Sequence, residues 1–182
     1  MNDGDFGELT YTLDDIVKTL NTVQPYDWAG YLKKHVYDIY AAPPLDGINK
    51  GGYNLVFTDQ PTDWIKLAEK KAKNTDLTYS GGFVVGGDGK ISTVIWDSPA
   101  FNAGLTVGTE ILAVNGREFS GDSIKDAITA AKGRTVPVKL LVKSGDLYRT
   151  VDLNWHEGLK YPRLVKTGKG EGTLDKLLAP RK

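Results

Sequence analysis

Residues 97–116 read DSPAFNAGLTVGTEILAVNG, and the small residues of this stretch each meet a backbone requirement. Ser98 suits the N-cap of a helix and Pro99 suits its first position, while Gly104 predicts a left-handed end after a turn or two. Gly108 then turns the chain into an apolar strand, which the closing Asn-Gly pair reverses. The stretch therefore predicts a short helix, a turn, a buried strand and a tight reversal.

Short strands and one long helix are predicted on both sides of this stretch. Strand patterns occur at 77–79 and 82–85, then at 90–96, and finally in the alternating runs VPVKLLVKS and DLYRTVDLNW. Between them, DSIKDAITAAKG predicts a helix with one apolar face and Gly133 as its C-cap. The order of these elements predicts an α+β fold, a small and partly open β-barrel with one long helix lying on it.

The first part of the chain, residues 10–74, is predicted to be mostly helical. YTLDDIVKTLN has the apolar period of an amphipathic helix, and Thr12 with Asp15 can form a capping box. DWAGYLKKHVYDIY predicts a second helix capped by Asp27, and TDQPTDWIKLAEKKAKN a third with Pro61 in its first turn, after a strand in GGYNLVF. The change to a strand period near Asp76 predicts a domain boundary there.

The composition is that of a globular protein with no strong charge bias. The 182 residues are 40% hydrophobic and 25% charged, and the 23 basic and 23 acidic residues cancel. This balance predicts neither a nucleic-acid nor a membrane partner. Absence of cysteine excludes disulfides and cysteine-ligated zinc. The acidic opening Met1 to Asp5 is unlike a basic signal peptide, and no apolar run reaches the length of a membrane span. The sequence therefore gives no prediction of the cellular compartment.

Residues 76–155 closely resemble a PDZ domain of the type associated with bacterial peptidases. The pattern of that family is Gly-Ser-Pro-Ala-x-x-Ala-Gly-Leu, followed by Gly-Asp-x-Ile and Asn-Gly. Asp97 stands where the family usually has glycine, and Thr109 where it has aspartate. The resemblance implies that an extended peptide adds to the strand beside the long helix, and that backbone N–H groups of the preceding loop receive its terminal carboxylate.

The same resemblance assigns candidate peptide-binding residues. They are Tyr79, Ser80, Gly81, Gly82, Phe83, Val84 and Val85 on the loop and strand, and Ile124, Ala127 and Ile128 on the helix. Glycine in the loop lets successive N–H groups converge on an anion. The family prefers a bulky apolar residue where Gly81 sits, which implies a looser pocket floor. For the apolar side chains of the strand and the helix, plain core packing is an equal alternative.

Nearly the whole chain resembles the C-terminal half of the glycyl aminopeptidases, zinc peptidases with a thermolysin-like catalytic domain followed by a PDZ domain. The segments that carry this resemblance are YTLDDIVKTLN, PYDWAGYL, APPLDGINKGGYNLVFTD, DLTYSGGFVV, WDSPAFNAGL and LDKLLAPRK. It implies three parts: residues 1–75 as the helical end of the catalytic domain, residues 76–156 as the PDZ domain, and residues 157–182 as a C-terminal tail. Many members are exported bacterial proteins, so the resemblance implies a periplasmic or secreted parent.

The zinc signature of that family, His-Glu-x-x-His, is missing from this sequence. Its two histidines, His35 and His156, have no second histidine four residues away. Ser80 is better explained as a loop residue and Ser98 as a cap than as nucleophiles, because neither has a histidine base in its pattern. We therefore expect no catalytic residue, metal ligand or cofactor in this chain, and zinc in the catalytic domain outside it.

Two functions follow as hypotheses. The first is a non-catalytic part of a metallo-aminopeptidase whose PDZ domain binds peptide or docks on its own catalytic domain and regulates it. The alternative is a free-standing module that binds extended peptides or protein C-termini. Aromatic side chains of the helical part are predicted to pack against a catalytic domain: Tyr26, Trp28, Tyr31, Tyr37 and Tyr40.

Overall fold

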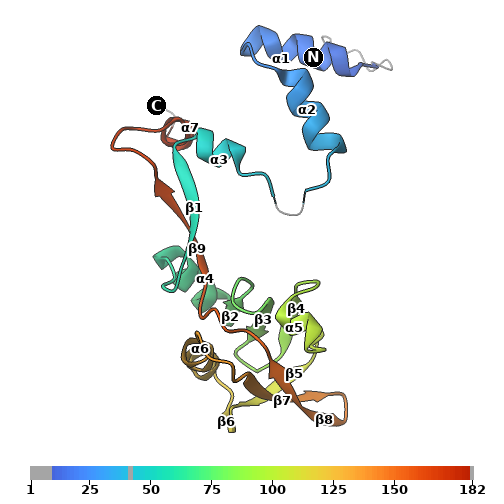
Figure 1. Cartoon of the computed structure of the whole chain (residues 1–182), viewed down its shortest axis with the longest axis vertical. Coiled ribbons are helices and arrows are strands. Elements are labelled where there is room, and N and C mark those ends of the chain that lie inside the picture. Colours follow the sequence, from blue (N-terminus) through green and yellow to red (C-terminus); the bar gives the residue numbers. More distant parts are fainter. Residues whose placement is uncertain (1–9, 41–42, 181–182) are drawn as a thin grey trace. The chain divides into compact units, whose positions relative to one another are not determined.

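A computed structural model describes residues 10–40 and 43–180 of the chain (Figure 1). The chain forms two compact units, residues 1–45 and residues 46–182. The predicted boundary near residue 76 lies inside the second unit, and the predicted division into three parts stays a prediction. No helix among the described residues is long and apolar enough to cross a membrane.

Unit 1 consists of two amphipathic helices, α1 (Leu13–Val23) and α2 (Trp28–Tyr37). The predicted capping box is confirmed, since the backbone N–H of Thr12 donates to Asp15 Oδ2 at 2.9 Å and the reciprocal bond is present. The predicted extension of α2 to residue 40 is wrong. The chain becomes extended at Asp38, and the hydroxyl of Tyr40 turns back to the carbonyl oxygen of Lys34 at 3.4 Å.

Unit 2 contains two antiparallel sheets that stay open. One has the order β2-β3-β4 and the other the order β6-β5-β7-β8. The strands are β2 (Asn74–Leu77), β3 (Phe83–Gly86), β4 (Ile91–Val94), β5 (Glu110–Val114), β6 (Arg117–Glu118), β7 (Val138–Ser144) and β8 (Leu147–Leu153). Helix α5 (Pro99–Asn102) precedes β5, and the long helix α6 (Gly121–Ala130) lies between β6 and β7. This is the predicted α+β, PDZ-like architecture.

The stretch at 97–116 folds as its sequence predicts. The hydroxyl of Ser98 accepts a hydrogen bond from the N–H of Phe101 at 3.2 Å and so caps α5. Asn115 and Gly116 both have positive φ angles and join β5 to β6. Asp97 also has a positive φ, of 58°. Glycine adopts such angles most readily, which explains why the PDZ family that this stretch resembles usually has glycine at this position.

Two local predictions in the PDZ-like part of unit 2 are wrong. The first strand is not at 77–79 but at Asn74–Leu77, because Thr78 begins the turn that leads to β3. Gly133 is not the C-cap of α6, which is Ala131. Gly133 lies two residues further on, where its left-handed φ of 70° directs its N–H to the carbonyl oxygen of His156 at 2.9 Å.

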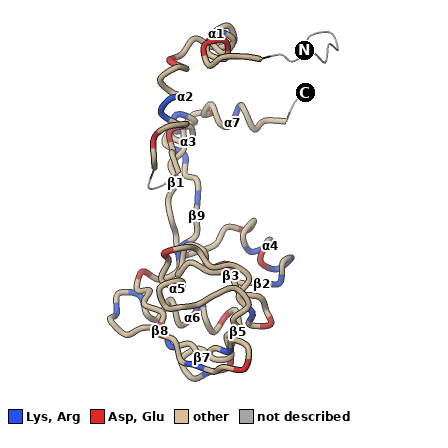
Figure 2. Tube along the Cα trace, turned by 90° about the vertical axis from the view of Figure 1, so that its right-hand side faces the viewer, with Lys and Arg blue, Asp and Glu red and all other residues tan. Residues whose placement is uncertain are grey.

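A two-stranded ribbon joins the ends of unit 2. Strand β1 (Tyr53–Thr58) pairs antiparallel with β9 (Tyr161–Lys166), and the two run side by side in both views (Figures 1 and 2). Three helices flank the ribbon in sequence: α3 (Asp46–Lys50), α4 (Asp63–Ala72) and α7 (Thr173–Leu178). Thr62 caps α4, so Pro61 precedes the helix rather than lying in its first turn as predicted. Residues 161–178 therefore return to the segment before β2.

Asp175 ties α7 to this ribbon. Its carboxylate pairs with Lys166 Nζ at 2.8 Å, accepts a hydrogen bond from the Tyr53 hydroxyl, and accepts another from the N–H of Gly172 at 2.8 Å. These contacts, those of Lys166 and Tyr53 first, lower the pKa of Asp175 from 3.8 to about 2. A lowered pKa means that the carboxylate stabilises the folded state above about pH 4, and that this contribution is lost as the pH falls through about 2.

We expect an NMR titration of the Asp175 carboxyl carbon to give a midpoint near pH 2. Asp175→Asn should speed amide exchange in α7 at neutral pH and make little difference below the midpoint, where the wild-type carboxyl is itself neutral. Asp146→Asn, in the exposed turn between β7 and β8, is the control. A midpoint at the ordinary value of 3.8 would contradict the role given to Asp175.

Candidate peptide-binding groove

The loop predicted to receive a carboxylate connects β2 to β3. Ser80, Gly81 and Gly82 are buried, while Tyr79 is 50% exposed. Two N–H groups of the loop converge on a single oxygen, which is a backbone carbonyl oxygen, and the predicted binding of a carboxylate there stays a prediction. The N–H of Ser80 and the N–H of Gly82 donate to the carbonyl oxygen of Leu77 at 2.9 and 3.0 Å. The oxygen that both groups bind is therefore the carbonyl oxygen of the last residue of β2.

Strand β3 carries the candidate residues of the groove floor. Phe83 and Val85 are fully buried, and Val84 between them is half-buried because alternate side chains leave opposite faces. Antiparallel pairing with β4 occupies one edge of β3, and antiparallel pairing with β2 occupies the other. A strand has only two edges, so β3 has none free for an added peptide in this structure.

Helix α6 carries the other candidate residues. Ile124 and Ile128 are fully buried and Ala127 is 9% exposed. All three belong to one hydrophobic cluster with Phe83 and Val85 of β3, and Leu77 of β2 is part of the same cluster. The structure therefore brings the predicted strand and helix residues together, and their packing is that of a core. Their role in binding a peptide stays a prediction.

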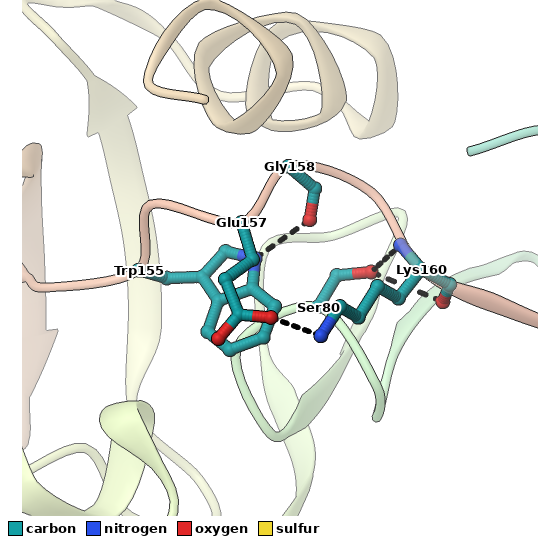
Figure 3. A network of polar contacts seen from close by, with 5 residues as sticks. All are labelled: Ser80, Trp155, Glu157, Gly158 and Lys160. Carbon is teal, nitrogen blue, oxygen red and sulfur yellow. Dashed lines mark hydrogen bonds and ion pairs between the residues drawn. The ribbon is translucent and has the colours of Figure 1, made fainter. Parts of the chain in front are cut away.

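Ser80 has a structural partner that the sequence did not reveal. Its hydroxyl accepts a hydrogen bond from the N–H of Lys160 at 2.8 Å and lies 3.3 Å from the carbonyl oxygen of the same residue (Figure 3). Lys160 Nζ also forms an ion pair with Glu157 and lies 5.1 Å from the ring centroid of Trp155. The indole N–H of Trp155 donates to the carbonyl oxygen of Gly158. Ser80 therefore anchors the segment between β8 and β9 to the loop.

The two histidines lie far apart in sequence and have different surroundings. His35 stacks on Tyr31 with ring centroids 4.0 Å apart in unit 1. His156 in unit 2 accepts the N–H of Gly133 at its backbone carbonyl. Among the described residues, no group of three or more histidine, cysteine, aspartate or glutamate side chains is placed to hold a metal ion.

Comparison with known proteins gives a likeness in fold. No family model matches the sequence, and no curated protein matches it. An aminopeptidase N family protein from Idiomarina loihiensis aligns with 92% of the chain at a TM-score of 0.55 and 16% sequence identity. The chain spans 28% of the length of that structure. The HtrA3 PDZ domain bound to a phage-derived ligand aligns with 63% of this chain and 91% of its own, at 16% identity and a TM-score of 0.31.

The likeness to the aminopeptidase N family protein shows a shared fold for nearly the whole chain. It agrees with the predicted resemblance in fold. The assignment to the glycyl aminopeptidases is narrower and stays a prediction.

Gly82 provides a test of how tightly the loop is built. A Cβ at Gly82 would overlap the side chain of Ser98, whereas a Cβ at Gly108 would meet nothing within 4 Å, and both glycines have φ angles near +90°. We expect Gly108→Ala to cost about 1 kcal/mol of unfolding free energy from backbone strain alone. Gly82→Ala should cost about 3 kcal/mol because steric overlap adds to the strain. Urea unfolding measures both, and equal losses would contradict the packing of the loop against Ser98.

Proposed function

We propose that this chain is the non-catalytic, C-terminal part of a metallo-aminopeptidase, that unit 1 docks on the catalytic domain, and that the PDZ-like unit 2 regulates that domain. The likeness in fold to an aminopeptidase N family protein supports this reading. Zinc in such a parent belongs to the catalytic domain, outside this chain. The observation that carries the proposal is the open apolar surface of unit 1.

Unit 1 buries none of its described residues, although both of its helices are amphipathic. Its aromatic rings contact one another in edge-on, stacked or tilted pairs, and the series of contacts runs through Tyr26, Trp28, Tyr31, His35 and Tyr40. On α2 and just after it, Val36 is 68% exposed and Ile39 is fully exposed. A surface of this kind marks an interaction site. The last helices of a larger domain would present the same surface if that domain covered them.

The occupied groove in unit 2 favours docking over the capture of free peptides. An extended peptide binds a PDZ domain by adding a strand, and here both edges of β3 are already paired. The alternative, a free-standing peptide-binding module, needs the N–H groups of Ser80 and Gly82 to bind a carboxylate, and both are already bound to the carbonyl oxygen of Leu77.

The complete coding sequence that contains this chain is the first test. We expect a His-Glu-x-x-His helix upstream of residue 1. A complete coding sequence without it would overturn the proposal.

The docking surface has its own test in sedimentation experiments with the upstream domain expressed separately. Val36→Ser combined with Ile39→Ser should weaken its binding to this chain at least tenfold, because exposed apolar anchors lose their partner surface. Val136→Ser, which changes a 64% exposed apolar residue of unit 2, is the matched control and should bind as the unchanged chain does. Equal binding by all three would contradict docking through unit 1.

A further inference from the structure

Strand β2 occupies the place that an extended peptide would take beside β3. It runs antiparallel to β3 in a continuous register, with Leu77 opposite Phe83 and Asn74 opposite Gly86. Its far side meets the start of α6, because a Cβ at Gly121 would collide with the hydroxyl of Thr75. The segment 74–77 therefore lies between β3 and α6, the two elements that form the groove.

The carbonyl oxygen at the end of β2 takes the two N–H groups that the resemblance assigns to the carboxylate of a peptide. Leu77 is fully buried in the cluster that contains the groove residues of β3 and α6. Its carbonyl oxygen takes both converging N–H groups of the loop, those of Ser80 and Gly82. Burial alternates along the segment: the side chains of Thr75 and Leu77 are buried, whereas that of Asp76 between them is exposed.

Glu69 and Lys125, which we call the latch, connect β2 to α4 and α6 on its outer side. The N–H of Asp76 donates to Glu69 Oε1 of α4 at 2.8 Å, and Glu69 Oε2 pairs with Lys125 Nζ of α6 at 2.7 Å. Glu69 is therefore shared by the free edge of β2 and by the long helix, and α4 leads directly into β2 (Figure 1). The side chains of Glu69 and Lys125 are only 11% and 23% exposed, so solvent screens the pair less than a surface ion pair.

The charge on Lys125 persists at neutral pH. Burial acts to lower the pKa of Lys125, but the hydrogen bond and charge of Glu69, with a contribution from Tyr161, outweigh it and raise the pKa above 10.5. The ion pair is therefore present at physiological pH, and its contribution is lost only as the pH rises past the ordinary value for lysine.

We propose that β2 is an internal ligand: residues 74–77 fill the peptide groove between β3 and α6, and a free peptide binds there only after β2 is displaced. The inference rests on the PDZ-like fold of unit 2 and is independent of the aminopeptidase assignment. A tethered segment competes at a high effective concentration, so a peptide from solution is disfavoured while the latch holds. The ligand that replaces β2 has the same chemistry, an apolar C-terminal residue with a small hydroxyl residue two positions before it.

The test uses a fluorescein-labelled peptide that ends in Asn-Thr-Asp-Leu with a free carboxylate, titrated against the full chain by fluorescence anisotropy. Glu69→Ala combined with Lys125→Met removes both ends of the latch, so that no half-buried charge is left alone. We expect this variant to bind the peptide at least tenfold more tightly than the unchanged chain, because the open state becomes more populated. The same peptide with an amidated end should bind more weakly.

The matched control is Asp63→Ala combined with Lys66→Ala. It removes another ion pair of α4, one that is largely exposed and does not contact β2. The control should bind the peptide as weakly as the unchanged chain. Equal affinity of the unchanged chain and the latch variant, or no binding by a latch variant that keeps its circular dichroism spectrum, would overturn the proposal.

Amide exchange in the unchanged chain gives a second readout that does not depend on how the variant folds. At millimolar peptide, the N–H of Asp76 should exchange faster while the amides of β3 stay protected, since the peptide replaces β2 on the same edge. An unchanged rate at Asp76 would contradict displacement. A failure of the aminopeptidase proposal, by contrast, would alter neither result.

Discussion

The pairing of β2 with β3 is the interaction on which the rest of unit 2 depends. It makes β3 a central strand and brings Leu77 into the core cluster. It also fixes the loop between the two strands, whose converging N–H groups are satisfied by the Leu77 carbonyl oxygen. A buried loop needs such partners, because unpaired backbone N–H groups away from water are costly. The residues of β3 and α6 that the resemblance assigns to peptide binding are consequently part of the interior of this unit.

The segments before and after the PDZ-like sheets are coupled to this pairing from both sides. Helix α4 holds the free edge of β2 through Glu69, and the residues after β8 hold the loop through the bonds between Ser80 and Lys160. The pairing of β1 with β9 then connects the segment before α4 to the segment after Lys160. Residues 46–75, the last part of the predicted catalytic-domain end, and the predicted tail thus belong to one compact unit with the PDZ-like sheets. Such an arrangement suits a module that works within a larger protein.

The sequence predicts local features well where a single residue type meets a backbone demand. The cap at Ser98, the reversal at Asn115 and the apolar face of α6 are of this kind, and all are confirmed. The sequence pattern places the strand before the loop too late in the chain, because Asn74 and Asp76 are poor strand formers. Their pairing with β3 holds them in a strand. The pairing of β1 with β9 joins residues about a hundred positions apart, and local patterns contain no information on such registers.

The measurement that tests this account most directly is the nuclear Overhauser spectrum of the unchanged chain in solution without any peptide. The account predicts cross-strand contacts between Thr75 and Val85 and between Asp76 and Val84, as the register of β2 on β3 requires. It also predicts slow exchange for the N–H of Gly82, which is bound to the carbonyl oxygen of Leu77. Absence of those contacts together with rapid exchange at Gly82 would show an open groove and would contradict it.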